Sequence, residues 1–171
     1  MRIQVLGPVS VWRDGARLAL GSPQRRAILA LLTVSRGLQL PFAGLAEALW
    51  GERPPASAPN VVQTHIKHLR RLLEPGRPPR APSVVLPQVG DGYALRVPDD
   101  VVDLSRFRGL VDAADAARRH GDEGRASALL AEALGVWRQP PLVDLPFLAS
   151  HPMVVALTGS VVVWWHSTGM P

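Results

Sequence analysis

The segment Asn60–Glu74, NVVQTHIKHLRRLLE, constrains the fold more than any other stretch of this chain. At helical spacing its apolar side chains fall on one side and its polar side chains on the other, which predicts an amphipathic helix with one buried face. The polar side carries hydrogen-bonding and cationic groups and almost no acid. Its members are Gln63, Thr64, Lys67, His68, Arg70 and Arg71.

Such a helix face suits a groove of double-stranded DNA. Long cationic side chains can reach phosphates, and Gln, Thr and Arg can reach base edges. A basic face is also common on helices that are simply solvated, so the helix alone leaves both interpretations open. The neighbouring segments favour the first.

The two halves of the chain differ in charge. Residues 1–98 contain 13 Lys and Arg against 5 Asp and Glu, a net charge of +8. Residues 99–171 contain 6 against 9, a net charge of −3. The asymmetry indicates that the first half meets a polyanion and that the second half does something else. A codon bias toward Arg would explain the preference for Arg over Lys, but not this uneven placement.

Short alternating apolar runs open the chain. Arg2–Leu6 alternates, Val9 and Val11 continue the pattern, and Asp14-Gly15 is a strong signal for a two-residue hairpin. These runs predict a short N-terminal antiparallel sheet.

A helix is expected to follow the sheet. Ser22 and Pro23 suit its N-cap and first turn, and Gly37 suits its end. Arg25 and Arg26 lie in the first turn, where the helix dipole disfavours cations. A bound phosphate would offset that cost, so both are candidate contacts to the DNA backbone. Plain solvent exposure explains them equally well.

Three further segments complete the first half. A short helix is expected from about Pro41 to Trp50, and Ser57 is expected to cap the amphipathic helix. The strands Val84–Leu86 and Tyr93–Val97, joined through Gly90-Asp91-Gly92, predict a hairpin.

Residues 1–98 are therefore predicted to form an α+β winged helix-turn-helix domain. It would consist of the N-terminal antiparallel sheet, three helices and a C-terminal hairpin that serves as the wing. Arg77 and Arg80 lie at the entrance of this wing and are further candidate DNA contacts.

Residues 101–148 carry the spacing of an all-α helical hairpin. Its helices are predicted from Val101 to His120 and from Asp122 to Trp137, with Gly121 closing the first and Asp122 capping the second. The spacing A-x-x-L-L-x-x-A-L-x-x-W is similar to that of tetratricopeptide units, which stack as repeats. An ordinary hairpin packed on the first domain is the alternative.

The sequence offers no chemistry for an enzyme or a cofactor. It has no Cys, no phosphate-cradling glycine loop and no nucleophile elbow. His65 and His68 lie three residues apart, but without a nearby carboxylate or Cys we expect no metal site. The N-terminus lacks a signal peptide, and the longest apolar run, Met153–Trp165, is too short to span a membrane. We expect a cytoplasmic protein without a membrane partner.

Five blocks, in this order, resemble the SARP family, the pathway-specific activators of antibiotic biosynthesis in actinomycetes, which carry an OmpR/PhoB-type winged helix. The blocks are RIQVLGPVSV near the N-terminus, PQRRAILALL, ALWGERPPASAPNVVQTHIKHLRRLLE, GYAL at Gly92–Leu95 and DLSRF at Asp103–Phe107. The resemblance covers residues 1–148. Within it, LGVWRQPPLVDLPFL resembles the bacterial transcriptional activation domain.

The resemblance implies a DNA-binding transcription regulator. The helix from about Ser57 to Leu73 would enter the major groove of a direct-repeat operator, and the hairpin Val84–Val97 would touch the minor groove or its phosphates. The loop Gly51–Ala56 would face RNA polymerase, and self-association on direct repeats is a further implied contact. A phosphorelay role would come from the winged-helix family alone.

Residues 149–171 depart from the family pattern. They contain no Asp, Glu, Lys or Arg and no helical stripe, whereas the activation domain should continue through further helices. We expect a replaced or truncated end, such as a frameshift produces. Two alternatives to an activator therefore stay open: a competitor that occupies operators without recruiting polymerase, and a protein-interaction module that uses the helical hairpin.

Overall fold

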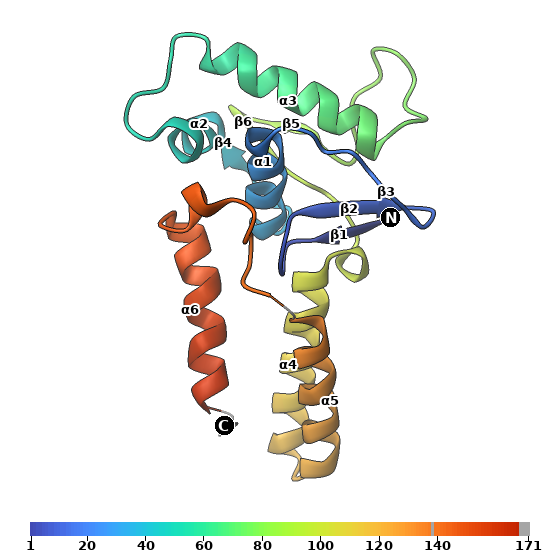
Figure 1. Ribbon diagram of the computed structural model, residues 1–171. Coiled ribbons are helices and arrows are strands. Elements are labelled where there is room, and N and C mark those ends of the chain that lie inside the picture. The colour runs from blue at the N-terminus through green and yellow to red at the C-terminus, as the bar shows by residue number, and fades with distance from the viewer. Residues whose placement is uncertain (138, 168–171) are drawn as a thin grey trace.

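The structure is a computed structural model that describes residues 1–137 and 139–167, with side chains as far as residue 159. Figure 1 shows the helix of residues 58–73 lying across one end of the molecule, and the helices of the second half of the chain pointing toward the other end. Within the described residues, no helix is long and apolar enough to span a membrane.

The N-terminal sheet forms as predicted. Its antiparallel strands are β1 (Arg2–Gln4), β2 (Ser10–Arg13) and β3 (Ala16–Arg17), and Ile3 lies opposite Val11. The predicted hairpin turn has positive φ at both Asp14 (51°) and Gly15 (80°). Asp and Gly tolerate this left-handed conformation, so the dipeptide sets the register of β2 and β3.

Three helices follow: α1 (Pro23–Val34), α2 (Phe42–Trp50) and α3 (Ala58–Leu73). The Ser22 hydroxyl accepts the Arg25 N–H at 3.3 Å, so the predicted cap of α1 is confirmed. The predicted cap of α3 is wrong, because the Ser57 side chain makes no capping bond. Instead, the Ala58 N–H donates to the Pro55 carbonyl at 2.9 Å, in a tight turn before the helix.

The wing is shorter than predicted and has a third strand. Its strands are β5 (Gln88–Val89), β6 (Gly92–Tyr93) and β4 (Leu40–Pro41), in the order β4-β6-β5. The predicted strand Val84–Leu86 is wrong, because other partners take the backbone N–H groups of residues 84–86. The predicted strand Tyr93–Val97 is regular only at Tyr93. Beyond it, Arg96 N–H donates to the Val85 carbonyl at 2.8 Å without forming a strand.

The helical hairpin forms as predicted. A short turn, η1 (Asp99–Val101), leads into α4 (Asp103–Arg119), and Asp122 caps α5 (Glu123–Val136) by accepting the Arg125 N–H at 2.9 Å. The two helices pack through the rings of Phe107 and Trp137, whose centroids lie 5.3 Å apart.

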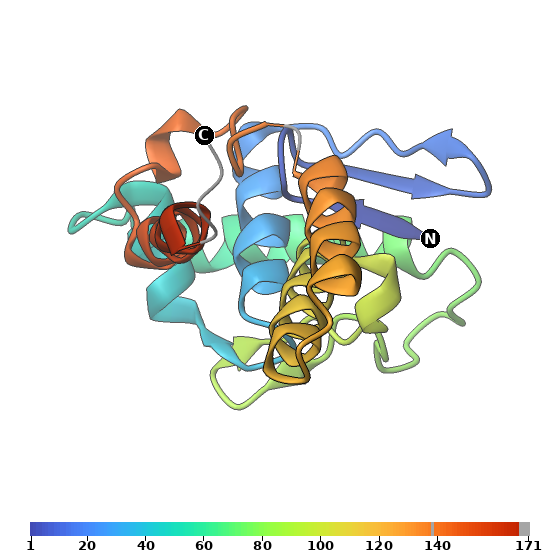
Figure 2. The same cartoon turned by 90° about the horizontal axis from the view of Figure 1, so that it is seen from below.

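Residues after the hairpin form two more elements, η2 (Pro146–Leu148) and α6 (Pro152–Ser167). A helix therefore forms in the tail although the sequence there has no helical stripe. The sequence gives no helical stripe there because the segment is apolar on every side. Val154 and Leu157 are buried and join the common core, and Figure 2 shows α6 end-on beside α1.

Hydrogen bonds join the N-terminal sheet to the second half of the chain. The Asp103 carboxylate accepts the backbone N–H groups of Val5 and Leu6, each at 2.9 Å. The Asp144 carboxylate accepts the Val9 N–H at 2.9 Å. One continuous cluster of buried side chains runs from Ile3 to Leu157, so the predicted boundary near residue 100 crosses a shared core.

Candidate nucleic-acid interface

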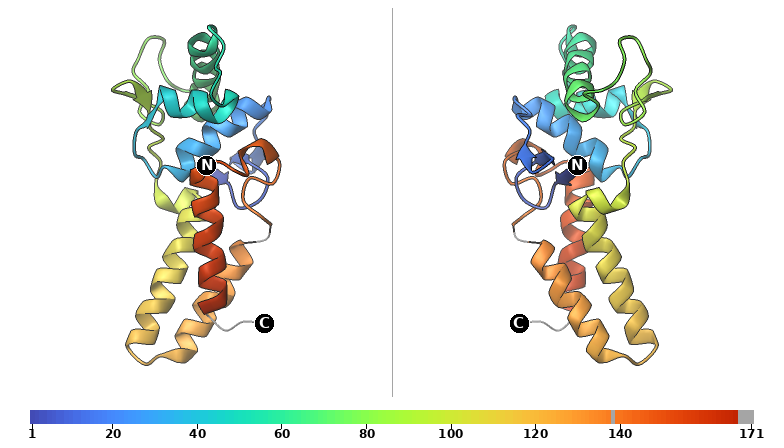
Figure 3. Two further views of the ribbon diagram at one scale, coloured as in Figure 1. Left: turned by 90° about the vertical axis from the view of Figure 1, so that its left-hand side faces the viewer. Right: turned by 90° about the vertical axis from the view of Figure 1, so that its right-hand side faces the viewer.

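The outer face of α3 lies at one end of the molecule. Figure 3 shows α3 nearly end-on, with the α4–α5 hairpin pointing away from it. Its inner side chains, Val62, Ile66 and Leu69 among them, are buried against α1 and α2. Five of the six predicted polar positions are exposed on the opposite side: Gln63, Thr64, Lys67, His68 and Arg71.

The exposed face is positively charged. Among the described residues, no acid lies within salt-bridge distance of Lys67 or Arg71. These two cations lie four residues apart, so they share one side of the helix. The Thr64 hydroxyl donates to the Asn60 carbonyl at 2.8 Å, which leaves its lone pairs available to a partner. Such a face can hold anionic phosphates and offer donors and acceptors to base edges.

Arg70, the sixth predicted residue, is turned toward the wing. Its Nε donates to the Leu86 carbonyl at 2.9 Å, and its guanidinium lies 5.7 Å from the centre of the Tyr93 ring. Burial lowers the pKa of Arg70 from its usual value, although the group stays cationic. Arg70 therefore ties α3 to the segment before the wing, and Tyr93 is buried as expected of a structural residue.

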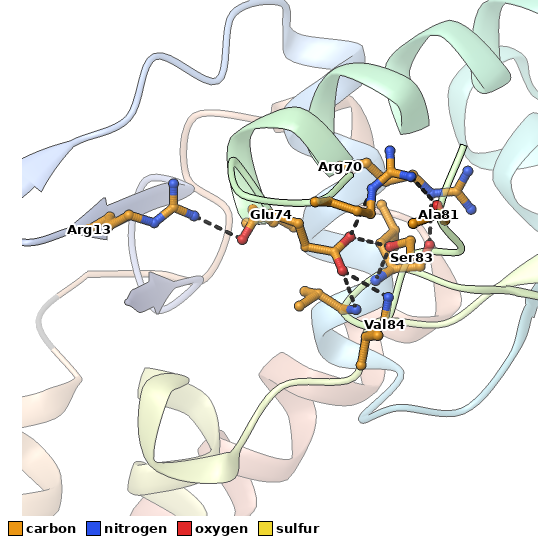
Figure 4. Close-up of polar contacts among 10 residues, drawn as sticks. Arg13, Arg70, Glu74, Ala81, Ser83 and Val84 are labelled. Atoms are coloured by element: carbon orange, nitrogen blue, oxygen red, sulfur yellow. Dashed lines mark hydrogen bonds and ion pairs between the residues drawn. The ribbon is translucent and has the colours of Figure 1, made fainter. Parts of the chain in front are cut away.

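Arg77 and Arg80 lie in the loop of residues 75–87 between α3 and β5. The Arg77 Nη1 donates to the Ala81 carbonyl, and its Nε lies 3.9 Å from the Glu74 carboxylate (Figure 4). Arg80 is exposed and has a positive φ of 64°. Figure 3 shows this loop and the wing on the same side of α3.

Arg25 and Arg26 are engaged in contacts within the chain. Arg25 Nη1 donates to the Leu20 carbonyl at 3.0 Å, and Arg26 Nη1 donates to the Gly21 carbonyl at 2.6 Å. Arg26 Nε also pairs with the Asp144 carboxylate at 2.8 Å. These partners account for two cations in the first turn of α1 without a bound phosphate.

The two histidines of α3 point in different directions. His65 is buried, with its Nε2 3.4 Å from the Gln24 side-chain oxygen, whereas His68 is exposed. Burial, and then the nearby charges of Arg25 and His68, lower the pKa of His65. Within the described residues, no three side chains are grouped so that they could hold a metal ion.

Sequence reasoning missed the polar residues that organise the loop after α3. The Ser83 hydroxyl donates a hydrogen bond to the Glu74 carboxylate, and Arg13 of β2 donates to the Leu73 carbonyl at 2.9 Å. One signal was present in the sequence: Glu74 is the only acid between Arg53 and Gly90, in an otherwise basic segment. An isolated acid in such a segment indicates a specific partner.

The two small sheets, the three helices and the exposed basic face of α3 define the winged-helix class. Residues 16–95 match the family described as "Transcriptional regulatory protein, C terminal", and residues 102–162 match the "Bacterial transcriptional activator domain". The second match runs past Leu148 into the predicted tail.

Several regulators are similar in sequence. The chain is 42% identical over 147 residues to the regulatory protein AfsR of Streptomyces coelicolor, covering 85% of this chain and 14% of AfsR. It is 36% identical over 160 residues to the transcriptional regulatory protein EmbR of Mycobacterium tuberculosis, covering 93% of this chain and 41% of EmbR. With the transcriptional regulator RedD of Streptomyces coelicolor the identity is 33%, over 84% of this chain and 41% of RedD.

A solved structure shares the fold. Mycobacterium tuberculosis EmbR in complex with a low-affinity phosphopeptide gives a TM-score of 0.84 at 36% identity, covering 95% of this chain and 42% of that one. The chain thus spans less than half the length of each of these relatives.

The chain belongs to the SARP-type transcriptional regulators, because both matched domains occur in order and its relatives include AfsR, EmbR and RedD. The resemblance and the winged-helix fold expected from the sequence are confirmed. EmbR and RedD are named as transcriptional regulators and AfsR as a regulatory protein, which agrees with the expectation that the chain is not an enzyme.

Proposed function

We propose that this chain binds double-stranded DNA in a sequence-specific manner and regulates transcription, with α3 lying in the major groove. The observation that carries the proposal is the outer face of α3. Lys67 and Arg71 lie there without an acidic partner among the residues that the structure describes, while the opposite face of the same helix is fixed in the core.

The exposed residues divide by chemistry. Lys67 and Arg71 would contact phosphates, because a cation on a flexible stem can reach the backbone on either side of the groove. Gln63, Thr64 and His68 would contact base edges, since each offers donors or acceptors. Arg77 and Arg80 would contact the DNA backbone beside the wing. The wing itself would contact the minor groove. Arg25, Arg26 and Arg70 would act mainly by holding the fold.

The remaining parts of the proposal rest on the family. The operator would contain direct repeats, on which two copies of the chain could associate, and the regulated genes would form a secondary-metabolite cluster. The loop Gly51–Ala56 is exposed between α2 and α3 and would face RNA polymerase. A protein with these partners would work in the cytoplasm, at the nucleoid.

Salt dependence of DNA binding tests the proposal. Duplexes from the promoter region of the chain's own genes would be titrated at 50 to 200 mM salt. Four phosphate contacts predict a slope of about −3.6 for log affinity against log salt, or a loss on the order of 10²-fold over this range. Absence of binding, or affinity that does not change with salt, would contradict the proposal.

A protein-interaction module is the second candidate. One observation favours it: Val143 and Val155 are both about half exposed, and both line an apolar hollow between the segment after α5 and the start of α6. Apolar surface of this kind is typical of contact with a protein partner. Formation of a protein complex that is insensitive to salt, by a chain that does not bind DNA, would favour this function over the first.

A further inference from the structure

Glu74 organises the loop that follows α3, although the loop has no regular secondary structure between residues 75 and 87. One carboxylate oxygen of Glu74 accepts the N–H groups of Val84 at 2.8 Å and Val85 at 3.1 Å. The other accepts the Ser83 hydroxyl (Figure 4). The Ser83 oxygen in turn accepts the Leu86 N–H at 2.9 Å. One side chain thus fixes the far end of the loop to the last turn of α3.

Three arginines complete the attachment. Arg70, on the preceding turn of α3, donates to the Leu86 carbonyl at 2.9 Å, and Arg13 holds the helix end through the Leu73 carbonyl at 2.9 Å. Arg77 lies beside the Glu74 carboxylate and donates to the Ala81 carbonyl, which folds the tip of the loop back on itself. Both ends of the loop and its tip are therefore linked to the same carboxylate.

The position of Glu74 is unfavourable for an acid unless it has these partners. Glu74 is the C-cap of α3, where the helix dipole repels negative charge, and its side chain is only 11% exposed. Burial opposes ionisation, but the bonds from Ser83, Val85 and Val84 and the charge of Arg77 outweigh it, so the pKa of Glu74 lies below its usual value. Charge-assisted bonds of this kind are about twice as strong as neutral ones.

The loop that Glu74 holds carries two of the cations of the proposed interface. Figure 1 shows the loop rising beside the C-terminal end of α3 to the level of that helix. Arg80 is exposed near its tip, and no acid among the described residues pairs with it. If this loop were loose, it would lose conformational entropy on binding. A loop already ordered by Glu74 avoids that cost.

We propose that Glu74 is a positioning residue for DNA binding, which presents Arg80 to the DNA backbone next to the groove that α3 enters. The inference rests on the proposed function. It assigns a role in DNA binding to an acidic side chain that itself would be repelled by phosphate. If Glu74 merely lay near the DNA, removing its negative charge would strengthen binding. If Glu74 is a positioning residue, removing the charge must weaken binding.

A double-mutant cycle between Glu74→Gln and Arg80→Ala tests this role. Arg80→Ala should lower affinity for duplex DNA by roughly tenfold at 0.1 M salt and reduce the slope of log affinity against log salt by about 0.9. Glu74→Gln should produce a similar loss, and the double variant should lose little more than either single one. Glu132 lies on the exposed side of α5, paired with Arg106. Glu132→Gln removes the same charge there and should leave the affinity for duplex DNA and the salt slope unchanged.

Hydrogen exchange without DNA supplies the independent measurement. In Glu74→Gln the amides of Val84 and Val85 should exchange faster than in the unaltered chain, while amides in α4 keep their protection. Additive losses in the cycle, tighter DNA binding by Glu74→Gln, or unchanged exchange at residues 84 and 85 would each overturn the role of Glu74 and leave the proposed function standing. Failure of the unaltered chain to bind any duplex would overturn both.

Discussion

At the scale of residues, the polar positions of α3 have two different fates. Lys67 and Arg71 lie on the middle of the outer face, whereas Arg70 lies at its edge, next to the buried positions Ile66 and Leu73. An arginine at that edge can turn toward solvent or toward a neighbouring carbonyl. Periodicity predicts which residues are near the edge, but the choice depends on Leu86 and Tyr93, which come from distant sequence.

His65 makes stability depend on pH. Its pKa is lowered by burial and by Arg25 and His68, so the folded chain keeps the ring neutral. The unfolded chain takes up a proton as the pH falls through the usual value of about 6.5, which stabilises the unfolded state. We expect the free energy of unfolding, measured with urea, to fall as the pH drops below about 7. The fall should be smaller in His65→Gln.

His120 provides the matched control for this measurement. It is exposed at the end of α4, so His120→Gln should keep the pH dependence of the unaltered chain. A pH dependence in His65→Gln equal to that of the unaltered chain would show that the buried ring does not cause it.

At the scale of elements, the wing depends on close contact between β4 and β6. A Cβ atom on Gly92 would lie 2.1 Å from the backbone oxygen of Leu40, so any side chain there must push the strands apart. Gly92→Ala should destabilise the chain by about 1–3 kcal/mol, as overpacking does. Thermal unfolding would measure the loss.

The control for Gly92 is a glycine in open space. Gly109 lies within α4, is exposed, and a Cβ on it would meet no other atom within 4 Å. Because glycine is a poor helix former, Gly109→Ala should raise stability by about 0.5–1 kcal/mol. Similar effects of the two substitutions would contradict the close approach of β4 and β6.

The elements that could be predicted were those whose pattern is local. α1, α4 and α5 have apolar periodicity, α1 and α5 also have the side-chain caps Ser22 and Asp122, and Asp14-Gly15 specifies its own turn. β4 could not be predicted, because Leu40–Pro41 becomes a strand only by pairing with β6. The strand expected at residues 84–86 failed because Glu74 takes the N–H groups that a strand would need. α6 has no amphipathic pattern from which a helix could be inferred.

At the scale of the whole molecule, the winged helix and the helical part share one core. Asp103 of the second half accepts the backbone N–H groups of Val5 and Leu6, and Asp144 accepts that of Val9. Burial raises the pKa of Asp103, while the N–H groups of Val5, Leu6 and Leu104 oppose that rise. Composition predicted two regions of opposite charge but could not predict that they would be bonded together.

Asp144 is expected to contribute measurably to the stability of this junction. Asp144→Ala would leave the Val9 N–H without its acceptor and Arg26 without its acidic partner, so unfolding should require about 1–3 kcal/mol less. Calorimetry should show one unfolding transition for the unaltered chain, with equal calorimetric and van't Hoff enthalpies. Asp100→Ala, at an exposed acid of η1, should change stability little. Two separate transitions in the unaltered chain would contradict a shared core.

The central claim is that the outer face of α3 is the surface that meets DNA. The direct measurement is the salt slope of duplex binding by Lys67→Ala/Arg71→Ala, compared with Arg118→Ala/Arg119→Ala, which removes two cations from the far end of α4. We predict that Lys67→Ala/Arg71→Ala reduces the slope of log affinity against log salt by about 1.8. Arg118→Ala/Arg119→Ala should leave this slope unchanged, and the two double variants should have equal thermal stability. Equal slopes for the two double variants would contradict the assignment of α3 as the DNA-binding helix.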